Sequence, residues 1–189
     1  MHKAQLIPDR TISPGMAELT SDPKMEQMLS EHPTPEGFCA KLARIFHVRV
    51  TEVALLRAEG GFLKFLFPGE LRTVGTIPLS SSSSVAAHTA STRKLELFNS
   101  FTKVRHAGVF ESVKLGKPEE DGFTEGVPIQ KLMSAPILDL GGKILGVLQV
   151  SRKGPEPSNC GPDFTLEDLQ QLGNAANLAA KAEFMKDNG

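Results

Sequence analysis

Residues Ser134–Val150 read SAPILDLGGKILGVLQV, and this stretch decides the fold. Two apolar runs flank a Gly-Gly pair at 141–142, which supplies the positive backbone dihedrals that a tight hairpin turn needs. The second run is apolar almost throughout, which is typical of a strand covered on both faces. Pro136 in the first run cannot donate to a ladder, so we expect a strand end, an edge or a bulge there. The stretch predicts a hairpin with strands at about 131–140 and 143–151.

Helix signals stand on both sides of this hairpin. Thr34–Glu36 offers a capping hydroxyl, a proline and an acid, and apolar residues at 38, 42 and 45 then form one stripe. Thr165–Asp168 offers a threonine with an acid three residues on, which predicts a helix at about 165–186. The second half of that helix is rich in alanine. Either its small side chains allow close packing against another helix, or the alanines simply favour a partly exposed helix.

The region between the first helix and the hairpin alternates strands with one short helix. A serine, Ser83 or Ser84, is expected to cap the short helix. Before the hairpin, we expect residues 101–113 to be irregular with helical fragments and residues 116–128 to form an exposed loop. The expected elements are strands at Val53–Ala58, Phe62–Phe67, Thr73–Leu79 and Leu95–Phe98, and the helix at Val85–Ala90.

The bulk properties are those of one ordinary soluble domain. The chain has 189 residues, 40% hydrophobic and 23% charged, with a net charge of −1. This charge gives no broad attraction to nucleic acid or anionic membrane, and no apolar run approaches the roughly 20 residues that span a bilayer. We expect a flexible arm at residues 1–22, a single domain at 23–189 with its core at about 34–186, and a cytoplasmic location.

The cysteine and histidine residues, which often act in catalysis or bind metals, show no catalytic or metal-binding pattern in this sequence. Cys39 lies on a predicted helix among apolar residues and is expected to be a buried thiol, whereas Cys160 lies in an exposed loop. The two are not expected to pair, and no cysteine or histidine has metal-ligand spacing. His88 is expected at a helix surface or core edge. We therefore predict neither a catalytic residue nor a metal site.

Four segments carry a family likeness in their order along the chain. They are a helix followed by a short strand at Val85–Asn99, a proline-containing strand at Lys131–Ile137, the strand Gly142–Val150, and the helix entry Phe164–Leu172. Together they resemble the GAF domain family over roughly residues 34–186. The resemblance implies an α+β sandwich with an antiparallel sheet of about five or six strands. Helices from the two ends of the domain would cover one face, and the short helix with its loops would cover the other.

The resemblance also indicates where a ligand would lie, between the sheet and the short helix with its loops. Arg105 would meet an anionic group and His106 would offer a switchable contact, although both could be surface residues. The phenylalanines could wall a pocket or simply pack, Asn99 could form a turn, and Ser134 could bond a neighbouring backbone group. The candidate ligand-binding residues are Phe98, Asn99, Phe101, Arg105, His106, Phe110 and Ser134.

The function implied by the resemblance is regulatory. Members bind small effectors or partner proteins, and some only dimerise, so we expect a non-catalytic sensory module that forms a homodimer through its terminal helices. No particular cofactor follows. Residues 104–111 lack the Asp-Glu pair of the cyclic-nucleotide members. A ligand-free docking module is the alternative. The family's reductases of free methionine sulfoxide need cysteines at the pocket, and neither Cys39 nor Cys160 lies in a segment expected there.

Overall fold

The computed structural model describes residues 7–13, 23, 26–27, 31, 34–73, 75–101 and 127–186. These residues form an antiparallel sheet of seven strands, in the order β1-β5-β6-β7-β2-β3-β4. The strands are β1 Arg10–Ile12, β2 Val53–Glu59, β3 Phe62–Phe67, β4 Thr76–Pro78, β5 Leu95–Phe98, β6 Ile129–Leu138 and β7 Ile144–Lys153. The α-helices are α2 Pro35–Ile45, α3 Val85–Thr92 and α4 Leu166–Ala179.

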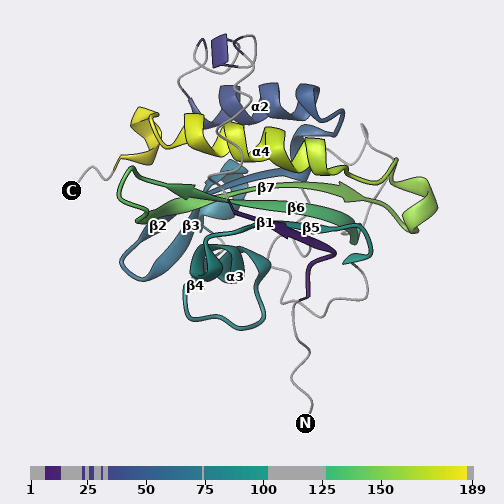
Figure 1. The fold of residues 1–189 in the computed structure, drawn as a ribbon, viewed down its shortest axis with the longest axis horizontal. Coiled ribbons are helices and arrows are strands. Elements are labelled where there is room, and N and C mark those ends of the chain that lie inside the picture. The colour runs from purple at the N-terminus through teal and green to yellow at the C-terminus, as the bar shows by residue number, and fades with distance from the viewer. Residues whose placement is uncertain are drawn as a thin grey trace.

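The molecule has three layers, which confirms the predicted α+β sandwich. Helices α2 and α4 cover one face of the sheet, and α3 lies against the opposite face (Figure 1). Short 3-10 turns complete the connections at Val50–Glu52, Gly69–Thr73, Pro157–Asn159 and Glu183–Met185. No helix in the part of the chain that the structure describes has the length and apolar character needed to cross a bilayer.

The predicted hairpin forms the middle of the sheet. Strands β6 and β7 pair antiparallel, with Pro136 opposite Val147. In the turn, the Asp139 carboxylate accepts hydrogen bonds from the backbone N–H groups of Gly141 and Lys143, at 2.9 and 2.8 Å. Gly142 has a φ of 80°, the left-handed conformation that glycine adopts at little cost. Pro136 lies beyond Ser134, the last residue of β6 paired with β5, so on that side β6 is an edge and tolerates a missing N–H.

The pleat of the central strands divides the interior into two clusters. Along β6, Met133, Ala135 and Ile137 face the helices α2 and α4, and Leu132 faces α3. Strand β7 behaves in the same way, with Leu148 toward the helices and Val147 toward α3. Both strands are thus buried on both faces, which explains why their sequences are almost continuously apolar.

The three predicted helix starts are confirmed. The side-chain hydroxyls of Thr34, Ser84 and Thr165 each accept a hydrogen bond from the backbone N–H three residues on. At Thr165 the bond is reciprocal, because the Asp168 carboxylate accepts from the Thr165 backbone N–H at 2.7 Å. These contacts satisfy amide groups that would otherwise lack a partner in the first turn.

The sheet is larger than predicted because part of the expected N-terminal arm belongs to it. Residues Arg10–Ile12 form β1, which pairs with β5, and the Asp9 carboxylate accepts from the Asn99 backbone N–H at 2.6 Å. Strand β1 covers the edge of β5 that a sheet of six strands would leave unpaired. The expected flexible arm is therefore wrong for this segment, whereas the domain boundary at residue 23 stays a prediction.

The last helix is shorter than predicted, since α4 ends at Ala179 rather than near residue 186. The chain then folds back, so that Phe184 packs edge-on against Phe38 with ring centroids 5.7 Å apart, and Met185 becomes buried. A straight helix would carry both side chains away from the core. The alanines Ala175, Ala176 and Ala179 are buried in the chain's own helix-side core, so they already have packing partners within this chain.

Replacing Gly146 with alanine should destabilise the fold. An added Cβ would lie 2.1 Å from the Leu56 carbonyl oxygen and 2.7 Å from Met185 Cε, so strand β2 or β7 would have to move. We expect the free energy of unfolding to fall by about 2–3 kcal/mol or more, measured by urea denaturation. Gly69→Ala is the control, because nothing lies within 4 Å of its added Cβ. Equal stability of the two variants would contradict the tight contact between β2 and β7.

Candidate functional site

The sheet face toward α3 holds a compact apolar cluster. Phe98 at the end of β5 and Phe101 just beyond it are each 1% exposed, and their rings meet edge to face at 5.7 Å. Aliphatic side chains from β2, β3, β6, β7 and α3 complete the cluster, among them Leu56, Leu132 and Val147. These side chains form the second of the two apolar clusters in the interior.

A chain of polar side chains crosses this same face. It runs from Gln149 on β7 through Ser134 on β6 and Thr89 on α3 to Glu96 on β5, and it ends at His88 on α3. Gln149 Nε2 donates to Ser134 Oγ at 3.1 Å, and the Ser134 and Thr89 hydroxyl oxygens are 2.7 Å apart. Thr89 Oγ1 donates to Glu96 Oε2 at 2.6 Å, and His88 Nδ1 is 2.6 Å from Glu96 Oε1. We call these five side chains the α3-face polar chain.

The hydrogen bonds of the α3-face polar chain can all point one way. A hydroxyl carries one proton, so if Thr89 donates to the Glu96 carboxylate it must accept from Ser134. Ser134 in turn accepts from the Gln149 amide. Each donor then points toward the carboxylate, which is the arrangement that stabilises a buried negative charge.

Within the α3-face polar chain, Glu96 is the group whose protonation is most affected by its surroundings. Its side chain is 1% exposed, whereas that of His88 is 35% exposed. Burial raises the pKa of the Glu96 carboxyl above its usual value, although hydrogen bonds from Thr89 and His88 and the positive charges nearby oppose the shift. The pKa of this carboxyl therefore depends on two opposing effects, burial, which raises it, and the hydrogen-bond donors, which lower it.

The structure brings together three of the candidate ligand-binding residues. Phe98 and Phe101 belong to the apolar cluster, and Ser134 lies in the α3-face polar chain. Asn99 is engaged elsewhere: its side-chain amide donates to the Phe164 carbonyl at 3.0 Å and accepts from the Phe164 backbone N–H at 3.0 Å. The remaining candidates, Arg105, His106 and Phe110, lie outside the described residues and stay predictions.

Sequence reasoning missed Glu96, Thr89 and Gln149. In the strand Leu95–Phe98, the one charged residue alternates with leucines, which by itself indicates a strand with a solvent-facing side. Both faces of this strand are in fact buried. The usable signal was the combination of Glu96 with His88 and Thr89 on the preceding helix. His88 does lie at the edge of the core, as expected, but its partner was not foreseen.

The two cysteines lie away from the α3-face polar chain. Cys39 is buried in the helix-side core, and burial together with the nearby Glu36 carboxylate raises the pKa of its thiol. Cys160 is partly buried rather than exposed as predicted, since it packs close to Gly154, where an added Cβ would lie 3.0 Å from Cys160 Cβ. Both are free. Among the described residues, no three histidine, cysteine or acidic side chains are arranged to hold a metal ion.

Comparison with known proteins supplies the family. The sequence profile of the GAF domain matches residues 38–183, which is most of the chain and includes both faces of the sheet. The chain therefore belongs to the GAF domain family, whose members are generally regulatory or sensory modules. Among curated protein sequences, none matches this chain.

Solved structures with the same fold include both GAF domains and reductases. The GAF domain of a phosphoenolpyruvate-protein phosphotransferase from Acinetobacter is similar with a TM-score of 0.58 at 12% identity, covering 85% of this chain and 88% of that one. A type II free methionine-R-sulfoxide reductase from Thermoplasma acidophilum has a TM-score of 0.54 at 17% identity, covering 82% and 92%. The substrate complex of fRMsr from Staphylococcus aureus has a TM-score of 0.53 at 12% identity, covering 93% and 98%. At these identities the likeness concerns the fold alone.

Replacing Glu96 with glutamine should change how stability depends on pH. Because the pKa of Glu96 is raised on folding, the folded chain holds this proton more tightly than the unfolded chain. Its contribution to stability is full below about pH 4.5, the usual value, and is lost as the pH rises through the higher folded pKa. The free energy of unfolding of the wild type, relative to that of Glu96→Gln, should therefore fall as the pH rises through this range.

Urea denaturation at several pH values between 4 and 8 measures this difference. Glu167→Gln, at an exposed position of the first turn of α4, is the matched control. A relative stability of the wild type that rises with pH would show that the donors outweigh burial at Glu96.

Proposed function

We propose that this chain is a non-catalytic regulatory GAF module that binds a small-molecule effector on its α3 face. The supporting observation is the α3-face polar chain, set among apolar side chains. Buried hydroxyl, amide and carboxyl groups cost free energy unless each is hydrogen-bonded, and replacing a bonded pair by apolar groups of the same shape can be nearly neutral. Packing α3 onto the sheet therefore does not by itself require these groups. A few polar groups in an apolar site are what fixes the orientation of a small ligand.

The contacts of Asn99 support a structural link by which effector binding on the α3 face would affect the terminal helices. Asn99 follows Phe98 directly, and its side-chain amide bonds both backbone groups of Phe164. Phe164 immediately precedes Thr165, the cap of α4. An effector that favoured one position of Phe98 would therefore bias the start of α4, and so shift the population of two arrangements of the terminal helices.

The positions of the cysteines argue against the reductase alternative. Reduction of a sulfoxide by thiols needs a thiolate at the substrate and a second thiol to resolve the intermediate. The chain has two cysteines, and neither belongs to the apolar cluster on the α3 side of the sheet. Cys39 faces the other side of the sheet and its raised pKa disfavours the thiolate. Two free thiols also fit a reducing compartment, and we place the protein in the cytoplasm.

A ligand-free docking module is the second candidate, and the phenylalanines favour it. Phe98 and Phe101 are each 1% exposed and pack against one another. Side chains that already fill the apolar cluster reduce the space for a ligand. Effector binding then requires that these rings move, whereas a docking module needs no such movement.

Mass spectrometry of small molecules released from the purified native chain distinguishes the two candidates. An effector should be released in near-stoichiometric amount, and Ser134→Ala should reduce its retention roughly tenfold, because the substitution removes the hydroxyl shared by Thr89 and Gln149. Ser151→Ala is the control, since this buried serine of β7 donates to the Glu52 carbonyl instead. Absence of any bound molecule, and no thermal stabilisation by a metabolite library, would support the docking module.

We also propose a homodimer through the terminal helices. Three of the alanines that suggested this are buried within the chain, so the contact has to use other residues, and Leu166 at the start of α4 is 43% exposed. Sedimentation equilibrium at micromolar concentration should give twice the chain mass of 20.4 kDa, and Leu166→Glu should shift the protein toward the monomer. A wild-type monomer throughout this range would exclude the dimer.

A further inference from the structure

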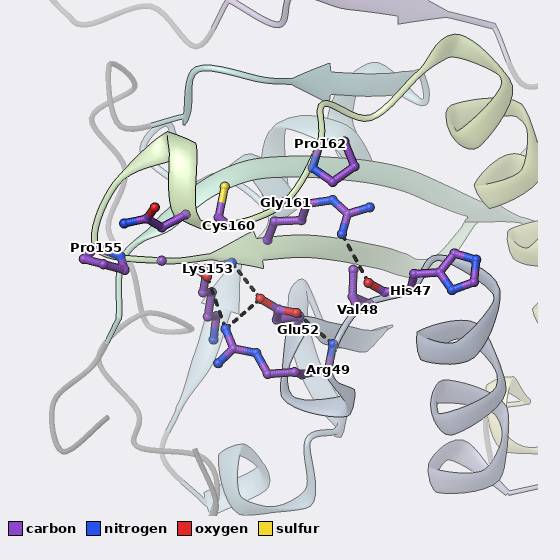
Figure 2. A pocket seen from close by; sticks show the side chains of 12 residues that line it. His47, Val48, Arg49, Glu52, Lys153, Pro155, Cys160, Gly161 and Pro162 are labelled. Carbon is purple, nitrogen blue, oxygen red and sulfur yellow. Dashed lines mark hydrogen bonds and ion pairs between the residues drawn. The ribbon is translucent and has the colours of Figure 1, made fainter. Parts of the chain in front are cut away.

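The end of α2 and the start of α4 meet at the end of β7. His47 and Val48 follow α2, Gly161 and Pro162 lead into α4, and all four line a cavity of about 750 Å³ (Figure 2). Contacts that border a cavity are not packed on every side, so they can rearrange without displacing the core. Whether the two terminal helices move separately or together depends on the contacts at this junction.

Arg152, the penultimate residue of β7, contacts both helix ends. Its Nη1 and Nη2 donate to the carbonyls of His47 and Phe46, each at 3.2 Å. Its guanidinium also lies 4.6 Å from the centre of the Phe164 ring, which is within the range of a cation–π interaction. Phe164 directly precedes Thr165, the cap of α4. One guanidinium thus joins the turn after α2 to the residue before α4.

The turn after α2 has a backbone conformation that needs support. His47 has a φ of 52°, the left-handed conformation that glycine usually provides after a helix. The Val48 backbone N–H closes this turn by donating to the Ala43 carbonyl at 2.9 Å. Carbonyl groups at the end of a helix lack partners within it, and a positive charge is favourable there. Arg152 therefore stabilises a turn that is strained at His47.

The start of α4 is held through its backbone by the neighbouring strands. Asn99, which follows β5, bonds both backbone groups of Phe164, and Lys131 on β6 contacts the Asp163 carboxylate at 2.8 Å. Arg152 contacts the ring of Phe164 instead. A shift of the backbone at Asn99 would therefore move the ring and change its distance from the guanidinium.

We propose that Arg152 couples the two terminal helices, so that a displacement of Phe164 at the start of α4 loosens the last turn of α2. When the ring moves away, the guanidinium loses its aromatic contact and leaves the two carbonyls more often. The strained turn at His47 then opens more often, which is a shift between two populations. The use of this coupling in regulation rests on the proposed effector binding on the α3 face, which Asn99 links to Phe164.

Hydrogen exchange of the purified chain, measured by NMR, tests the coupling without any effector. The Val48 amide reports opening of the last turn of α2, because its bond to Ala43 closes that turn. The Leu148 amide lies in the middle of β7, paired on both sides, and reports global unfolding. Comparing the two rates within each variant separates local opening from a loss of global stability.

Substitutions on the two sides of the contact should act through one link. Phe164→Leu removes the ring and keeps an apolar side chain, and it should accelerate exchange at Val48 by roughly fivefold. Arg152→Lys keeps the charge without the planar fork of donors, and it should accelerate Val48 at least as much. The double variant should exchange no faster than Arg152→Lys alone, since both changes break the same link.

Two further variants define the direction and the specificity of the effect. Asn99→Ala releases the backbone of Phe164 from the α3 side, and it should accelerate Val48 as Phe164→Leu does. Phe184→Leu is the matched control. Phe184 also packs against α2, through Phe38 near its start, so its loss should leave the rate at Val48 unchanged relative to that at Leu148.

The proposal is overturned by an unchanged rate at Val48 in Phe164→Leu, or by acceleration factors that multiply in the double variant. Equal acceleration in Phe184→Leu would indicate a general loosening of the helix layer and would also overturn it. No effect of Asn99→Ala would remove the link to the α3 side. None of these outcomes depends on whether the α3 face binds an effector, so a failure of the coupling is distinguishable from a failure of the proposed function.

Discussion

The register of the pairing between β6 and β7 is the constraint on which the rest of the structure depends. Both strands are buried on both faces, so each residue belongs either to the helix side or to the α3 side. A slip by one residue would exchange every side chain between the two and would send Ser134 among the aliphatic side chains under α4. The Asp139 turn sets this register at one end. The close approach of Gly146 to the Leu56 carbonyl oxygen holds β7 against β2.

The two faces then differ in chemistry. The helix side is an apolar core of α2, α4 and the sheet, and it includes the buried thiol of Cys39. The α3 side combines three buried phenylalanines with a hydrogen-bonded chain that holds a carboxylate, two hydroxyls and an amide. Asn99 connects the two faces, since it follows Phe98 on the α3 side and bonds Phe164 at the start of α4. In a regulatory module, such a connection is where a binding event and a change of helix position can be coupled.

Much of the fold could be predicted because its signals are local. A threonine or serine ahead of an apolar stripe, and a Gly-Gly pair between apolar runs, act within a few residues of one another. For this reason the helix starts at Thr34, Ser84 and Thr165 and the central hairpin are confirmed. Strand β1 and the end of α4 were predicted wrongly because distant partners decide them. Arg10–Ile12 is a strand because β5 offers a free edge, and α4 ends early because Phe38 and Gly146 offer places for Phe184 and Met185.

By itself, then, the sequence determined where α2, α3 and α4 begin, how the hairpin turns and which family pattern the chain follows, because those properties depend on neighbouring residues. It did not determine the sites. Glu96 meets Thr89 and His88 only when β5 lies beneath α3, and Arg152 meets the carbonyls of Phe46 and His47 only when the end of β7 lies against the turn after α2. Charge and hydrogen-bonding capacity are properties of the individual residues. Burial and hydrogen-bond partners depend on segments about a hundred positions apart in the chain, which only the tertiary structure brings together.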